Sequence, residues 1–128
     1  MSGIVLKSPT AQANLKFTGS FNRNLDISNG QIVAWVNFDG TTNVIREGFN
    51  VSSITDLGLG TFGITLTEAL PNTNYVITGF VNDDSIAITD IYEWGDFTTY
   101  RTTSYFAIRT TAGTSLVDRS CVQLIVFI

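Results

Sequence analysis

Aromatic and acidic side chains share the segment "DIYEWGDF", residues 90–97. Aromatic rings near a loop offer a large contact area at low conformational-entropy cost, and carboxylates can accept hydrogen bonds from sugar hydroxyls. The pattern predicts a glycan or receptor contact made by Tyr92, Trp94, Asp96 and Tyr100. The alternative is that Trp94 packs in the core or against another subunit, because tryptophan is usually well buried.

Groups suited to catalysis are scarce. The sequence contains no histidine, the commonest general base and metal ligand. The single cysteine, Cys121, allows no disulfide or cysteine-based zinc site within one chain, and its apolar run "CVQLIVFI" predicts a small buried side chain. Two carboxylates could hydrolyse a glycoside, but no pattern places a raised-pKa acid beside a nucleophile. We therefore expect a protein that is not an enzyme, with no catalytic residue, metal or cofactor.

The composition indicates a surface that needs covering. Charged residues make up 14% of the 128 residues and apolar residues 44%, whereas a typical soluble domain carries roughly 25% charge. A partner subunit could hide such a surface, because an obligate interface resembles a core cut in half. The net charge of −4 gives no support for nucleic-acid binding. No stretch approaches the roughly 20 apolar residues of a membrane helix, so we expect no membrane insertion.

The elements that would position these residues are β-strands. Apolar residues alternate with a period of two from residue 31 onward, and turn signals such as Asp39-Gly40 and Pro71-Asn72 recur every 8–12 residues or so. This spacing predicts one all-β domain over residues 29–128, an antiparallel, jelly-roll-like β-sandwich of about seven or eight strands. Residues 1–28 alternate weakly and predict an N-terminal arm or attachment segment.

Two of the expected strands are apolar on both faces, "QIVAWVNF" at residues 31–38 and "RSCVQLIVFI" at residues 119–128. A strand in a two-layer sandwich needs only one apolar face for the core. The second face could be buried between subunits. The residues predicted for this subunit interface are Val33, Trp35, Ile125 and Phe127.

Residues 34–79 resemble a module found in the tail fibres and related virion appendages of tailed bacteriophages. The resemblance lies in an "AWVNF" opening, then "NVSSITD" followed by glycines and an aromatic residue, then "ALPNTNY"; the closing strand "CVQLIVF" is similar too. It implies a β-sandwich, commonly assembled as a homotrimer, that projects from a virion and contacts a host surface or another virion protein. The module brings no catalytic motif to this sequence.

From the residues and the resemblance together, we expect a structural protein of the virion, assembled in the host cytoplasm. It would be a homotrimeric capsid decoration (a cement or head-fibre protein) or a tail-fibre-like appendage. Residues 1–28 would attach it to other virion proteins of the capsid or tail, and the sandwich would face outward. The alternative is a receptor-recognition module that binds a host surface glycan.

Overall fold

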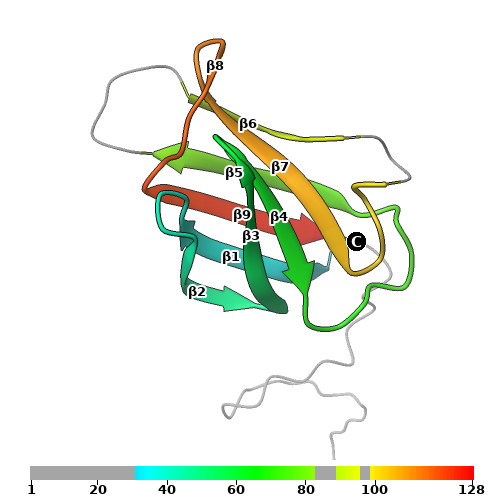
Figure 1. The fold of residues 1–128 in the computed structure, drawn as a ribbon. Coiled ribbons are helices and arrows are strands. Elements are labelled where there is room, and N and C mark those ends of the chain that lie inside the picture. Colours follow the sequence, from blue (N-terminus) through cyan, green and yellow to red (C-terminus); the bar gives the residue numbers. More distant parts are fainter. Residues whose placement is uncertain (1–30, 83–88, 96–98) are drawn as a thin grey trace, which may run out of the picture.

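The computed structural model describes residues 31–82, 89–95 and 99–128. These residues form nine β-strands and no helix (Figure 1). The first sheet has the strand order β2 (Val44–Phe49), β1 (Ile32–Asp39), β9 (Cys121–Phe127) and β5 (Val76–Asn82). The second has the order β3 (Val51–Gly58), β4 (Thr61–Leu66), β7 (Tyr105–Ala112) and β6 (Thr89–Glu93), and β8 (Ser115–Leu116) also pairs with β7. All the strand pairs are antiparallel.

The predicted antiparallel β-sandwich is confirmed, with slightly more strands than expected. The shortest strand is β8, which has only two residues, Ser115 and Leu116, too few for a period-two alternation to reveal. Its two residues pair with the end of β7, Leu116 opposite Thr111 and Ser115 opposite Ala112. The N-terminal arm proposed for residues 1–28 lies outside the described residues.

Asn50 carries the chain from one sheet to the other between β2 and β3. Its backbone has a φ of 58°, a left-handed conformation that asparagine tolerates better than most residues. Its side-chain amide donates to the carbonyls of Val33 (3.0 Å) and Glu68 (3.2 Å), and its Oδ1 accepts from the Glu68 amide (2.7 Å). The Asn50 side chain therefore provides hydrogen-bond partners for backbone groups of Val33 and Glu68, and it joins the corner between β2 and β3 to these two segments.

The core lies between the two sheets and follows the period-two alternation. From the first sheet, Val36 and Phe38 of β1 are buried, and from the second sheet Phe62 and Ile64 of β4 are buried. Phe38 and Phe62 meet across the core edge to face, with ring centroids 5.3 Å apart. Because alternate residues of each strand face this core, the remaining residues form two outer faces.

An ion pair closes the core at the side where β5 and β6 are the edge strands. The Arg101 side chain is 7% exposed, and its Nη1 lies 2.7 Å and 2.8 Å from the two carboxylate oxygens of Glu93. The guanidinium also donates to the carbonyls of Thr73 and Tyr75, and it lies 4.1 Å from the centre of the Tyr75 ring. The Tyr75 hydroxyl donates to the Thr102 carbonyl (2.8 Å), and burial raises the pKa of Tyr75 to about 12. This cluster ties β6 to the turn before β5.

Candidate interaction surfaces

The outer face of the first sheet is rich in exposed apolar side chains. Trp35 of β1 pairs with Phe49 of β2 on one side and with Ile125 of β9 on the other. One step along the sheet, Phe127 of β9 pairs with Val76 of β5. Cross-strand neighbours on one face of a sheet are in contact range, so these side chains form a continuous surface. We call it the apolar face; it comprises Ile32, Trp35, Phe49, Val76, Phe80, Ile125 and Phe127.

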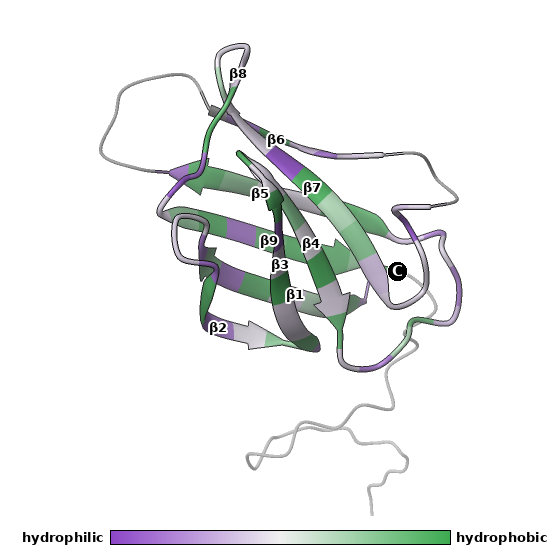
Figure 2. Cartoon of the chain, in the orientation of Figure 1, coloured by the Kyte–Doolittle hydropathy of each residue, from purple (hydrophilic) through white to green (hydrophobic). Residues whose placement is uncertain are grey.

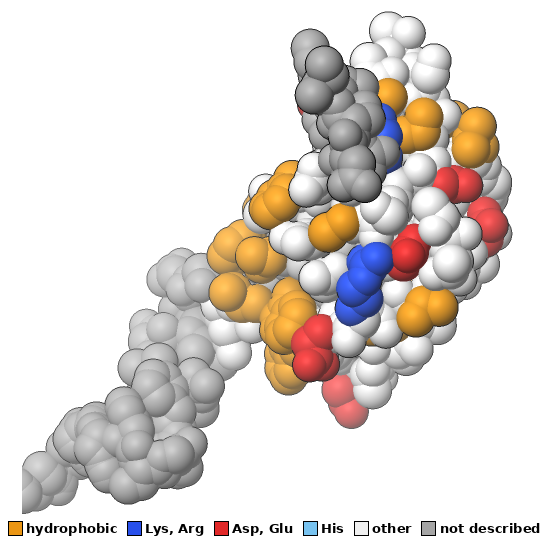
Figure 3. Space-filling view, turned by 90° about the vertical axis from the view of Figure 1, so that its left-hand side faces the viewer, with side chains coloured by type: hydrophobic (Ala, Val, Ile, Leu, Met, Phe, Trp, Pro, Cys, Tyr) orange, Lys and Arg blue, Asp and Glu red, His pale blue; other side chains and the backbone are white. Residues whose placement is uncertain are grey.

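The exposure of this face is large for hydrophobic residues. Phe80 is 61% exposed, Val76 60% and Phe49 55%. Figure 3 shows hydrophobic side chains gathered towards the left of its view, while charged side chains lie nearer the middle and right. Contiguous exposed apolar surface on a soluble protein usually marks an interaction site.

A groove of about 450 Å³ crosses the apolar face. Trp35 on β1 and Phe80 on β5 form its walls, and Gln123 and Ile125 of the intervening strand β9 form its floor. Thr78 lies on the β5 side, opposite Ile125 in the register. We call this the Trp35–Phe80 groove. It is a concave, mainly apolar site with a few polar groups, which is the usual character of a binding pocket.

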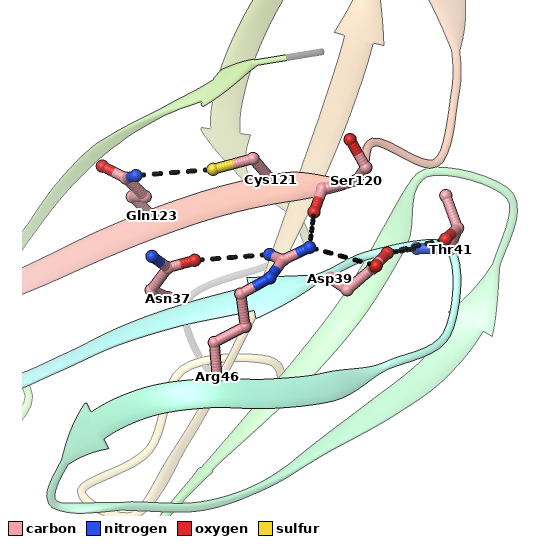
Figure 4. Close-up of polar contacts among 7 residues, drawn as sticks. All are labelled: Asn37, Asp39, Thr41, Arg46, Ser120, Cys121 and Gln123. Carbon is pink, nitrogen blue, oxygen red and sulfur yellow. Dashed lines mark hydrogen bonds and ion pairs between the residues drawn. The ribbon is translucent and has the colours of Figure 1, made fainter.

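The other end of the same outer face is polar (Figure 4). Arg46 reaches from β2 across β1 and donates to Asn37 Oδ1 (3.4 Å), Asp39 Oδ2 (3.1 Å) and the Ser120 carbonyl (2.5 Å). Hydrogen bonds from the Thr41 hydroxyl and amide, together with the charge of Arg46, lower the pKa of Asp39. Figure 2 shows hydrophilic segments of β1, β2 and β9 together at this end and hydrophobic ones at the other. The face therefore has a charged end and an apolar end.

Cys121 belongs to the polar end, and the prediction that it is buried was wrong. Its side chain is half-buried, and its Sγ accepts a hydrogen bond from Gln123 Nε2 (3.4 Å). The reason is the alternation of β9: Val122 and Leu124 face the core, so Cys121 and Gln123 face outward.

The four residues predicted for a subunit interface lie on two neighbouring strands of the first sheet. Trp35, Ile125 and Phe127 belong to the apolar face. Val33 lies where the register between β1 and β9 shifts, and it is partly buried against the core cluster. Sequence alternation alone missed the outer residues of the edge strands, Phe49 and Phe80, because strand order is needed to place them beside Trp35 and Ile125.

The second candidate surface lies on the second sheet at the end of β6. The Trp94 and Tyr100 rings have centroids 4.4 Å apart, and the Arg109 guanidinium lies over the Trp94 ring at 4.7 Å. Tyr92 pairs with Arg109 across β6 and β7 and is 46% exposed. Gly95 has a φ of +96°, and a Cβ there would lie only 2.2 Å from the Tyr100 ring. We call Tyr92, Trp94, Tyr100 and Arg109 the aromatic cluster.

Three of the four predicted contact residues therefore belong to one cluster, and Asp96 lies outside the described residues. Trp94 is half-buried, so Tyr92 offers the more exposed ring. Glu93, the acid between them, faces inward to Arg101 because alternation on β6 turns it away from Tyr92. Arg109 is not among the contact residues that the sequence predicts. The alternation of β7 places it on the outer face, but only the pairing with β6 brings it to the aromatic rings.

Within the described part of the chain, no group of three His, Cys, Asp or Glu side chains is placed to hold a metal ion. The described residues also contain no helix that is long and apolar enough to cross a membrane. Compared with protein-family profiles, curated proteins and solved structures, the chain gives no match.

Proposed function

We propose that this protein is a non-enzymatic structural protein of a bacteriophage virion that acts by associating with copies of itself. In this proposal it is a homotrimer, either a capsid decoration or a tail-fibre-like appendage. Residues 1–28 attach it to the particle and the sandwich projects outward. The observation that carries the proposal is the apolar face, which residues 31–82, 89–95 and 99–128 of one subunit leave exposed.

The position of this face suits assembly. Trp35 and Ile125 lie on β1 and β9, the two central strands of the first sheet, so they are held on both sides by backbone hydrogen bonds. A rigid surface loses little conformational entropy on association. Threefold symmetry is a closed symmetry. Each copy therefore contacts its neighbours within the trimer, and no apolar interface is left open to extend the assembly into a filament.

The resemblance to phage appendages supports the viral part of the proposal. The motif "AWVNF" lies on β1 and "CVQLIVF" forms β9. These two segments are far apart in the sequence, yet they are hydrogen-bonded neighbours that supply Trp35, Ile125 and Phe127 to the apolar face. The motifs that suggest the family are therefore also the ones that expose apolar side chains.

Sedimentation velocity of the full chain tests the proposal. We expect a trimer at micromolar concentration, and we expect Trp35→Asp to dissociate it because a carboxylate would have to be buried in the interface. Tyr92→Asp, a matched change on the second sheet, should leave the trimer intact. A wild-type chain that is monomeric throughout the micromolar range would contradict the proposal. Labelling of intact virions with a specific antibody, viewed by electron microscopy, distinguishes head from tail.

The aromatic cluster favours a second candidate function, binding of a host surface glycan. Exposed Tyr92 lies beside Arg109, so a ring for stacking and a hydrogen-bond donor are adjacent on an outward surface. Binding on a glycan array should be lost in Tyr92→Ala and in Trp94→Ala while circular dichroism shows an intact fold. Retention of binding in both variants would remove this site. The two functions are compatible, because the cluster and the apolar face are on different sheets.

A further inference from the structure

We propose that the Trp35–Phe80 groove is occupied by the N-terminal arm of a neighbouring copy, through residues 15–27. The inference rests on the proposed self-association and names what covers part of the apolar face. Residues 1–14 of each arm would remain for attachment to the particle.

The groove has the width of one extended chain. Trp35 and Phe80 are separated by the single strand β9. Adjacent strands lie about 4.8 Å apart, so the two walls stand about 10 Å from each other. An extended segment could therefore lie along β9 and place alternate side chains on Ile125.

The arm begins at the apolar end of this face. Gln31 and Ile128 exchange backbone hydrogen bonds of 3.1 Å and 2.9 Å, directly next to the pairing of Ile32 with Phe127. Thirty residues precede Gln31. In extended form they span at most about 100 Å, far more than is needed to reach an adjacent subunit.

The arm also has suitable chemistry. Its apolar residues nearest the domain are Leu15, Phe17, Phe21, Leu25 and Ile27. Residues 1–30 carry three cations and one carboxylate, a net charge of +2, whereas residues 31–128 carry four arginines and ten carboxylates, a net charge of −6. Copies of the domain therefore repel one another, and an arm of opposite charge offsets part of that repulsion.

The area of the face favours an arm from a neighbour over a contact between bare sheets. Four strands about 4.8 Å apart and seven residues long, at about 3.3 Å per residue, give a face of about 440 Å². A stable interface buries about 800 Å² of accessible surface on each partner, so a face of this flat area leaves room for a covering arm to add to the contact. An arm folded onto its own subunit would consume that surface without joining two copies. An exchanged arm adds area to every contact between neighbours.

Cross-linking in the full chain tests the proposal. Cys121→Ser removes the native thiol, Thr78→Cys places a thiol at the groove, and Asn22→Cys places one in the arm without removing an apolar residue. With a short bismaleimide we expect covalent dimers and trimers on a denaturing gel. The matched control replaces Thr78→Cys by Thr55→Cys, an exposed threonine of the second sheet, and should stay uncross-linked. Only intramolecular product, no product, or equal product in the control would overturn the proposal.

A second variant separates this inference from the proposed function. Phe17→Asp with Phe21→Asp should weaken self-association at least tenfold, whereas Thr10→Asp with Gln12→Asp, the same charge change farther from the domain, should not. If Trp35→Asp dissociates the trimer and the Phe17/Phe21 variant does not, the arm is not the occupant and the proposed function stands. If the wild-type chain never associates, both are wrong.

Discussion

The two tryptophans of this chain lie on opposite outer faces of one sandwich, and their surroundings differ. Trp35 forms one wall of an open groove on the first sheet, among apolar side chains that no part of the described chain covers. Trp94 on the second sheet lies against the Tyr100 ring and under the Arg109 guanidinium. The same residue type is thus covered by neighbouring side chains on the second sheet and lies among exposed apolar side chains on the first.

The rest of each outer face repeats this difference. On the second sheet the outward positions of the central strands hold Thr61, Thr65 and Arg109, of which Thr61 is only 4% exposed, and the Tyr105 ring lies across Gly63. Threonine fits a strand, and the Thr61 hydroxyl donates to the Leu59 carbonyl (3.2 Å), so the outward side of these strands is covered by contacts within the subunit. On the first sheet the corresponding positions hold Trp35 and Ile125. The central strands of the second sheet are therefore covered by side chains of the same subunit, whereas those of the first sheet expose apolar side chains that the described residues do not cover.

The largest expected effect comes from the ion pair beneath the aromatic cluster. Arg101→Met leaves the Glu93 carboxylate and two carbonyls without their donor, and it should lower the free energy of unfolding by about 3 kcal/mol. Arg109→Met removes a cation–π contact near the surface and should cost about 1 kcal/mol or less. Urea denaturation of both variants measures the difference. Similar losses of unfolding free energy in the two variants would mean that the buried Arg101–Glu93 ion pair stabilises the aromatic cluster no more than the surface contact of Arg109 does.

A smaller effect is expected where the second sheet covers itself. A Cβ at Gly63 would lie 2.3 Å from the Tyr105 hydroxyl oxygen, so Gly63→Ala must displace that ring and should cost about 1–2 kcal/mol. In a Tyr105→Ala background the same substitution should be nearly neutral, because the ring is gone. Thermal denaturation of the four chains gives the coupling. Additive losses would show that Tyr105 does not lie over this glycine.

The smallest effect concerns Tyr75, which lies under Arg101. Tyr75→Phe removes the hydrogen bond to the Thr102 carbonyl and should cost about 1 kcal/mol near neutral pH. In the wild type the pKa is about 12, against 10.0 for an ordinary tyrosine. The unfolded chain therefore loses this proton first, and stability should fall as the pH rises from 10 to 12. Tyr75→Phe should show a shallower fall in urea titrations across that range; parallel curves would contradict the assignment.

The β-sandwich could be predicted from the sequence because strand positions and core-facing residues follow from patterns within short segments. Phe62, Ile64 and Leu66 alternate with small polar residues, and Pro71 ends that strand, so strand and core face follow directly. The outer apolar residues of β1 and β9 could also be predicted, because both alternating sets of residues in these strands are apolar and the core takes only one set. Cys121 was misplaced because its apolar surroundings outweighed its position in the alternation of β9.

The candidate sites depend on strand pairing, which the sequence does not state. Phe80 reaches the groove because β5 pairs with β9, and Arg109 reaches Trp94 because β6 lies beside β7. The partners of Glu93 were also hidden, because the turn that brings Arg101 to it has no regular pattern. Long-range contacts of this kind decide which side chains meet, whereas periodicity decides only which way they face.

Whether copies associate through the apolar face can be measured directly with two single-tryptophan variants, by quenching their fluorescence with acrylamide. Trp94→Phe leaves Trp35 as the reporter of the first sheet, and Trp35→Phe leaves Trp94 as the reporter of the second. As protein concentration rises from nanomolar to micromolar, quenching of Trp35 should fall while quenching of Trp94 stays constant. If Trp35 remains equally quenched at every concentration, or if only Trp94 becomes protected, the apolar face is not the surface through which copies associate.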